Sequence, residues 1–162
     1  MLKSLAALLI ATMMCLATIA TARAQDRPEP WVGTWKVDLE RSTYSPGPKP
    51  SQPAVVTMEM MPGGAIKTTI DTTDPTGQPA HTETIGMFDG KQNPVTGAAP
   101  NTTTAYTRLD ERTFQAEGKV NGTPTLTTRV TISADGNTLT ATQTGKNAQG
   151  DDVSNVIVAR RQ

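Results

Sequence analysis

From Trp31 to its end, the chain alternates polar and apolar residues in short runs that turn sequences separate. A period of two is typical of a strand with one buried face, and no window shows a competing helical period. Gly together with Asp or Asn occupies most of the links, as tight turns require. The pattern predicts nine strands, at 31–38, 54–61, 65–71, 81–88, 103–109, 113–120, 126–133, 138–144 and 153–161.

The short links predict how these strands are arranged. Tight hairpins join antiparallel neighbours, so consecutive strands should form one meander. A long meander exposes two edges unless it closes on itself. We therefore predict an all-β domain over 31–162, an antiparallel meander that closes into a barrel of about 8–10 strands. The proline-rich stretch 41–53 cannot continue a ladder and is expected to be an extended connection.

The first 24 residues lack this alternation and read as an export signal. Lys3 supplies a positive start, 5–20 is apolar and uncharged, and Ala22-Arg23-Ala24 is a small-x-small cleavage sequence. The apolar run of about 16 residues is shorter than the roughly 20 that a spanning helix needs. We expect cleavage after Ala24, a polar leader at 25–30, and a periplasmic or secreted protein without a membrane span.

The single cysteine, Cys15, lies inside this signal. It follows Thr12-Met13-Met14 and not the small residues of a lipid-attachment site, so we expect no lipid anchor. A mature chain without cysteine has no disulfide, and its stability depends on its core alone.

Composition narrows the classes further. The chain has 15 basic and 15 acidic residues, and loss of Lys3 and Arg23 with the signal leaves 13 and 15, a net charge of −2. This balance, without a run of like charge, argues against a nucleic-acid partner and against a charged membrane-surface patch. Threonine, stiff at its first torsion, contributes 25 of the residues after Ala24 and favours strands. A monomer is expected.

The first and last strands carry a more specific pattern. Gly33-Thr34-Trp35, the run of hairpins and a final basic residue together resemble the calycin pattern of lipocalins, fatty-acid-binding proteins and avidins. In those barrels such a Trp plugs one end and an Arg often packs over it. The resemblance implies a lipocalin-like barrel with Gly33, Trp35 and Arg160 as the structural plug. Arg160 shares parity with Val156 and Val158, and Arg161 is the alternative cation. Trp31 should be more exposed than Trp35.

A second resemblance covers most of 31–162. Asp89-Gly90-Lys91, the Pro-Val-Thr-Gly segment at 94–97 and the segment 133–140 are similar to segments of a family of small exported bacterial proteins without assigned function. This resemblance supports export and implies no activity.

Strand parity selects candidate residues for the barrel interior. The parity that the apolar side chains share carries Trp35, Met58, Met60, Ile85 and Met87. The parity of Ile85 and Met87 also carries His81 and Glu83, which would then point inward near an entrance. An imidazole beside a carboxylate can act as a general base with its orienting group. No serine in a nucleophile turn and no thiol accompanies them, so we favour solvated rim residues and expect no enzyme.

Tyr106 and Arg108 share one face of their strand. A phenol and a guanidinium so placed can hold a carboxylate, and fatty-acid-binding proteins use an Arg/Tyr pair of this kind inside the barrel. The other parity fits the sequence equally well: Ala105 and Leu109 then point inward, and Tyr106 and Arg108 face water. Both arrangements stay open.

About eight strands suffice to hold one small ligand. The expected function is therefore binding of a small, mostly apolar molecule inside the barrel. The parity residues would line the site, His81 and Glu83 would lie at its entrance, and Tyr106 with Arg108 would be polar anchors. The alternative is a filled barrel with a structural or protein-interaction role, its partners held by loops such as 41–53 and 92–102. No cofactor is expected.

The methionines offer a third function. Met58, Met60, Met61 and Met87 carry soft sulfur atoms that suit Cu(I). Only one histidine could join them, and alternation turns Met61 away from Met58 and Met60. Methionine more often fills irregular apolar space, so no metal site is expected.

Overall fold

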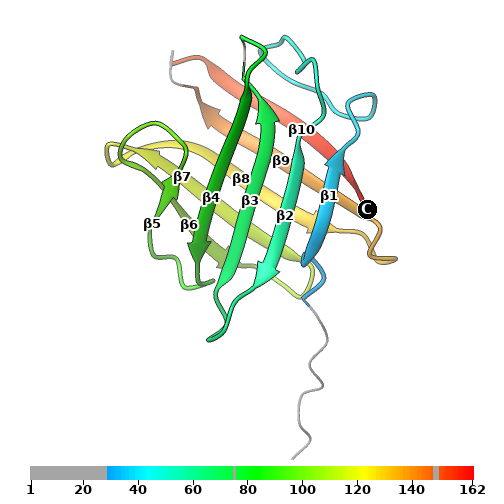
Figure 1. The fold of residues 1–162 in the computed structure, drawn as a ribbon, viewed down its shortest axis with the longest axis vertical. Helices are drawn as coiled ribbons and strands as arrows, with labels where there is room; N and C mark the ends of the chain where they lie inside the picture. Colours follow the sequence, from blue (N-terminus) through cyan, green and yellow to red (C-terminus); the bar gives the residue numbers. More distant parts are fainter. Residues whose placement is uncertain (1–28, 75, 148–149) are drawn as a thin grey trace, which may run out of the picture.

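The computed structural model describes residues 29–74, 76–147 and 150–162 (Figure 1). The expected signal peptide, Cys15 and the cleavage point after Ala24 lie outside these residues. Within the described ranges, no helix is both long enough and apolar enough to cross a membrane.

Ten strands of the described chain form one closed antiparallel barrel (Figure 1). Each strand pairs with its neighbours in sequence, and β1 pairs with β10 to close the ring. The strands are β1 (Gly33–Val37), β2 (Val55–Met60), β3 (Ile66–Thr73), β4 (Pro79–Gly86), β5 (Asn93–Thr96), β6 (Thr102–Arg108), β7 (Thr113–Val120), β8 (Thr123–Ile132), β9 (Thr138–Lys146) and β10 (Asp152–Arg161). The all-β meander and its closure are confirmed.

The nine predicted strands correspond to every element except β5. We expected 92–102 to be a loop, and that expectation is wrong for Asn93–Thr96. Four residues are too few to show alternation, and Pro94 offers no N–H to a ladder. The register nevertheless pairs Thr84 with Val95 on one side and Thr104 with Asn93 on the other.

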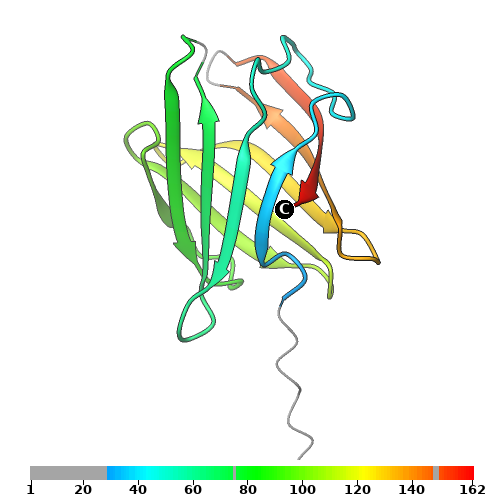
Figure 2. The same cartoon turned by 45° about the vertical axis from the view of Figure 1, so that its right-hand side comes forward.

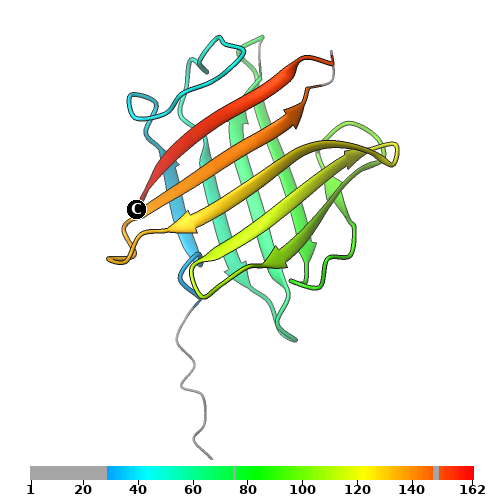
Figure 3. The ribbon, with the colours of Figure 1, turned by 180° about the vertical axis from the view of Figure 1, so that it is seen from behind.

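The barrel has two distinct ends. At one end lie the residues before β1 and the turns 61–65, 87–92, 109–112 and 133–137; we call it the closed end. At the other lie the connection 38–54 and the turns 74–78, 97–101, 121–122 and 147–151; we call it the mouth. Figure 2 shows β1–β4 side by side as one wall. Figure 3, seen from behind, shows β6–β10 in front of that wall and strongly tilted against it.

The connection 38–54 forms no strand, as its prolines predict, and it covers the part of β10 that β1 leaves unpaired. β1 pairs only with the last residues of β10, which leaves the rest of that strand without a partner on one side. Thr43 fills this place: its N–H donates to Val156 O (2.8 Å), and Val156 N–H donates to Thr43 O (2.9 Å). Ser42 Oγ accepts from Val158 N–H (3.0 Å) and donates to Asp38 O (2.7 Å).

Candidate ligand cavity

Aromatic side chains fill the closed end. Trp31 and Trp35 are both fully buried, and Trp35 Nε1 donates to Trp31 O (2.8 Å). The Trp31 ring centroid lies 5.1 Å from Phe88 and 5.4 Å from Phe114. We call these four residues the aromatic floor. The predicted burial of Trp35 is confirmed.

The expectation that Trp31 is more exposed is wrong. A turn in which Val32 N–H donates to Glu29 O (2.9 Å) folds the chain back beneath the barrel, which places Trp31 against the other rings. Its Nε1 is buried without a hydrogen-bond partner among the described residues.

Arg161, and not Arg160, is the cation on the plug. Its Cζ lies 4.2 Å from the Trp35 ring centroid, because the register places Trp35 directly opposite Arg161 on the same face. The guanidinium donates to Val32 O (2.6 Å), Pro30 O (2.7 Å) and Gly136 O (2.8 Å).

Gly33 makes this close approach feasible. Its φ is 134°, and a Cβ built there would lie 2.4 Å from Arg161 Nη1. A larger residue would therefore clash with the guanidinium and strain the backbone. Gly33 thus belongs to the plug, as the resemblance implied.

β10 buries residues on both of its faces. The face that Arg160 shares with Val158 is therefore not the interior face. Ile157 and Ala159 face the interior, whereas Val158 is buried on the outer face, where Asp38 N–H and Ser42 bond to its backbone. Arg160 therefore points outward and pairs with Asp38 (3.2 Å). This hydrogen bond holds the pKa of Asp38 below its usual value.

Tyr106 and Arg108 divide between two environments, and neither expected arrangement is correct. Tyr106 is buried and faces the interior. Arg108, two residues further toward the closed end, lies over the rings of Trp31 (4.8 Å) and Phe88 (5.7 Å) and forms an ion pair with Glu29. The aromatic floor therefore separates the phenol from the guanidinium.

Above the floor, the barrel contains a cavity of about 470 Å³. Among the described residues that line it, there is no Asp, Glu, Lys, Arg or His. One wall, from β3, β4 and β6, is rich in hydroxyls: Thr68, Thr72, Thr82, Thr84, Thr104 and Tyr106. The opposite wall is largely apolar: Val37, Val56, Met58, Phe114, Ala116, Val130, Leu139, Ala141, Ile157 and Ala159. Toward the mouth, Thr125, Thr128 and Gln143 also line it.

Three buried hydroxyls gather deep in the polar wall. Tyr106, Thr68 and Thr84 are only 4%, 8% and 6% exposed. Burial raises the pKa of Tyr106, and the nearby hydroxyls of Thr68 and Thr84 oppose that shift. Thr68 Oγ1 lies near the phenol and is shielded from solvent. All three residues belong to the cavity lining.

Of the other predicted lining residues, Met58 faces this cavity, and Trp35 lies in the floor. Met60, Ile85 and Met87 do not line the cavity, contrary to the prediction, and are 41%, 44% and 43% exposed. Met60 shares the face of Met58 but lies at the end of β2, opposite Ile66, whereas Ile85 alternates with the inward Thr84 and lies on the outer face. That Met58 and Tyr106 contact a ligand stays a prediction.

The face of β4 is reversed relative to the expectation. Thr82 and Thr84 point inward, so His81 and Glu83 lie on the outer face and not at an entrance. His81 Nδ1 lies 2.7 Å from Asp71 Oδ1, and Glu83 pairs with Lys67 at 2.7 Å. The usual rule places apolar side chains inside, but this wall is lined with threonine. The abundance of threonine was the signal that could have revealed it.

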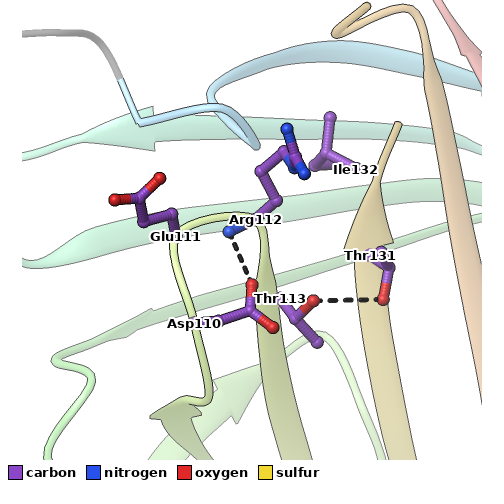
Figure 4. A pocket seen from close by; sticks show the side chains of 6 residues that line it. All are labelled: Asp110, Glu111, Arg112, Thr113, Thr131 and Ile132. Carbon is purple, nitrogen blue, oxygen red and sulfur yellow. Dashed lines mark hydrogen bonds between the residues drawn. The ribbon is translucent and has the colours of Figure 1, made fainter. Parts of the chain in front are cut away.

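A second hollow, of about 480 Å³, lies on the surface at the turn between β6 and β7 (Figure 4). Asp110 Oδ1 accepts from Arg112 N–H (2.8 Å), and this bond lowers the pKa of Asp110. The Thr113 and Thr131 hydroxyls lie 3.4 Å apart. These bonds shape a tight turn, and its carboxylate faces water, so the interior cavity is the better candidate site.

The methionines do not gather at one place. Met58 faces the cavity, whereas Met60 and Met87 are exposed. Within the described ranges, no three His, Cys, Asp or Glu side chains lie close enough to hold a metal ion.

Neither a protein-family model nor a curated protein sequence matches this chain. Among solved structures, the fluorescent protein UnaG is similar, with 18% identity, a TM-score of 0.56, and coverage of 84% of this chain and 100% of UnaG. The barrel has a calycin-like fold. The zebrafish ileal bile acid-binding protein complexed with cholic acid is also similar, with 12% identity, a TM-score of 0.46, and coverage of 82% and 99%.

Proposed function

We propose that this protein binds a small molecule inside the barrel, above the aromatic floor. The observation that carries the proposal is the cavity of about 470 Å³ inside the barrel, with hydroxyl-bearing side chains on one wall and largely apolar side chains on the opposite wall. Ligand pockets commonly span roughly 300–1,000 Å³ and combine an apolar lining with a few polar groups. The calycin-like fold agrees with this use.

The cavity favours a binding protein over the two alternatives. A filled barrel with a structural or interaction role would pack its interior to the usual protein density. An enzyme would need a catalytic group at the cavity. The His81–Asp71 pair could act as a general base, but it lies on the outer face, away from the cavity. We therefore propose a binding role without catalysis.

An uncharged environment-sensitive dye such as Nile red tests the binding role. We expect saturable fluorescence with the purified protein. Ala116→Trp should abolish it, because Ala116 lines the cavity beside Tyr106, its partner on the neighbouring strand. Met87→Trp is the matched control on the exposed surface and should leave dye affinity unchanged. Circular dichroism verifies that both variants fold. Absent saturation by the wild type, or equal affinity in both variants, would refute the proposal.

We also propose export as part of the function. The support is the sequence alone: a charged start, an apolar run and Ala22-Arg23-Ala24. The mature protein would then bind its ligand in the periplasm or outside the cell. Mass spectrometry of the protein from exporting cells should give Gln25 as the first residue. A start at Cys15 with acyl mass would refute this cleavage.

A further inference from the structure

We infer that the cavity selects an uncharged amphipathic molecule with one apolar face and a hydroxyl or carbonyl group on the other. This inference rests on the proposed function, because it concerns the ligand of the same cavity. It departs from the carboxylate ligand that an interior Tyr/Arg pair would have implied.

The described lining of the cavity has no counter-charge for a charged ligand. A carboxylate or ammonium group moved from water into a protein interior is strongly destabilised unless an opposite charge meets it. None of the described residues that line the cavity carries a charge. The two arginines that pack on the aromatic floor are already occupied: Arg161 by carbonyl oxygens and Trp35, Arg108 by Glu29 and Trp31. A charged ligand would therefore be rejected.

Most hydroxyl-bearing side chains of the cavity gather on one wall. Thr68, Thr84 and Tyr106 are buried on adjacent parts of one wall. Thr72, Thr82 and Thr104 extend this row of hydroxyl-bearing residues along the same wall. A ligand oxygen that bonds to this wall regains the hydrogen bonds that it loses on leaving water. This wall can both donate to and accept from a neutral oxygen group.

The wall opposite these hydroxyls is apolar. Leu139, Ala141 and Ile157 on β9 and β10, with Val130 on β8 and Phe114 on β7, offer carbon surface only. A ligand that is polar all round would lose its hydration against this wall without compensation. The two walls together therefore recognise a molecule with two faces.

Three probes that share one ring system separate these requirements: naphthalene, 2-naphthylmethanol and 2-naphthoate. Each displaces Nile red from the wild-type protein at pH 7, and the displacement gives its affinity. We expect 2-naphthylmethanol to bind at least about tenfold more tightly than 2-naphthoate, because only the carboxylate carries a charge into the cavity. The alcohol should also bind more tightly than naphthalene.

Two conservative variants test which residues read the oxygen. Thr68→Val and Tyr106→Phe should each bring the affinity for 2-naphthylmethanol toward that for naphthalene, with naphthalene affinity unchanged. Thr69→Val, the neighbouring position on the opposite face of β3, is the matched control and should change neither affinity. Both substitutions keep the shape of the side chain, so we expect both variants to fold. If one of them folds poorly, the affinities of the other still test the polar wall.

The outcomes distinguish this inference from the proposed function. Absence of Nile red binding refutes the proposed function and this inference with it. Nile red binding that Ala116→Trp blocks, together with equal affinity for the alcohol and the carboxylate, overturns this inference alone. Preference for the alcohol that survives both Thr68→Val and Tyr106→Phe overturns the assignment of the polar wall.

Discussion

The two ends of the barrel interior are built from different side chains. At the closed end, Trp31 and Trp35 are fully buried among further aromatic rings, and two arginines lie on their faces. Toward the mouth, the interior changes to threonines and small aliphatic residues, and it leaves about 470 Å³ unfilled. Dense aromatic packing contributes stability, whereas an open, hydroxyl-lined cavity lowers it and provides room for a ligand. We infer that stability and binding are assigned to separate halves of one barrel.

The largest expected effect is at the aromatic floor. Trp35→Ala should lower the free energy of unfolding by roughly 3–5 kcal/mol, because a buried large aromatic is removed and a cavity remains. Denaturant unfolding followed by circular dichroism measures the change. If Trp35→Ala melts at the wild-type temperature, the closed end is not the stabilising half.

A smaller effect should separate the two C-terminal arginines. Arg161→Met removes three charge-assisted hydrogen bonds and a cation–π contact, so a loss of about 1.5–3 kcal/mol is expected. Arg160→Met, the matched control one residue away, breaks only an exposed ion pair and should leave unfolding almost unchanged. Equal losses in the two variants would contradict the assignment of Arg161 to the plug.

Two buried hydroxyls should respond in opposite ways. Ser42→Ala leaves Val158 N–H without its acceptor and should destabilise the fold by about 1–3 kcal/mol. Thr68→Val removes a hydroxyl that has no partner among the described residues, so stability should stay level or rise. Chemical unfolding of both variants decides; a substantial loss in Thr68→Val would mean that its hydroxyl is already satisfied.

The smallest effect concerns pH. Backbone and side-chain hydrogen bonds, led by Arg112 N–H on Asp110 and by the Ser133 hydroxyl on Asp135, hold the pKa of both carboxyls below the usual 3.8. Groups with a lowered native pKa stabilise the fold above that usual value, and their contribution is lost as the pH falls through the native pKa. Melting temperature should therefore be flat near neutrality and fall below about pH 4.

Ligand affinity should not follow this acid dependence. The cavity lining has no acidic or basic side chain, and burial raises the pKa of Tyr106 above 10.0. Affinity for 2-naphthylmethanol should thus be constant between about pH 5 and 9. Titrations across this range measure it, and a clear change would reveal a titrating group in the cavity.

Much of the fold could be predicted from the sequence, because alternation and turn residues act locally. β5 could not be predicted, because a strand of four residues that includes a proline shows no alternation of polar and apolar positions. The position of Trp31 could not be predicted, since it depends on a turn that folds residues 29–32 beneath the barrel.

The interior was harder to predict than the strands. Parity arguments assume that apolar side chains point inward, and β4 places Thr82 and Thr84 inside while Ile85 faces water. On β10, the covering segment around Ser42 buries Val158 on the outer face, which concealed that Arg161 was the plug residue. In both cases the deciding contact comes from a distant part of the chain.

The central claim is that the cavity binds an uncharged molecule, and methionine methyl resonances test it most directly. With ¹³C-methyl methionine, titration of the purified protein with 2-naphthylmethanol should shift the Met58 signal saturably, because Met58 lines the cavity. The signals of Met60 and Met87, which are exposed on the surface, should stay in place. Shifts at Met60 and Met87 with Met58 unmoved would contradict the claim and place binding on the outside of the barrel.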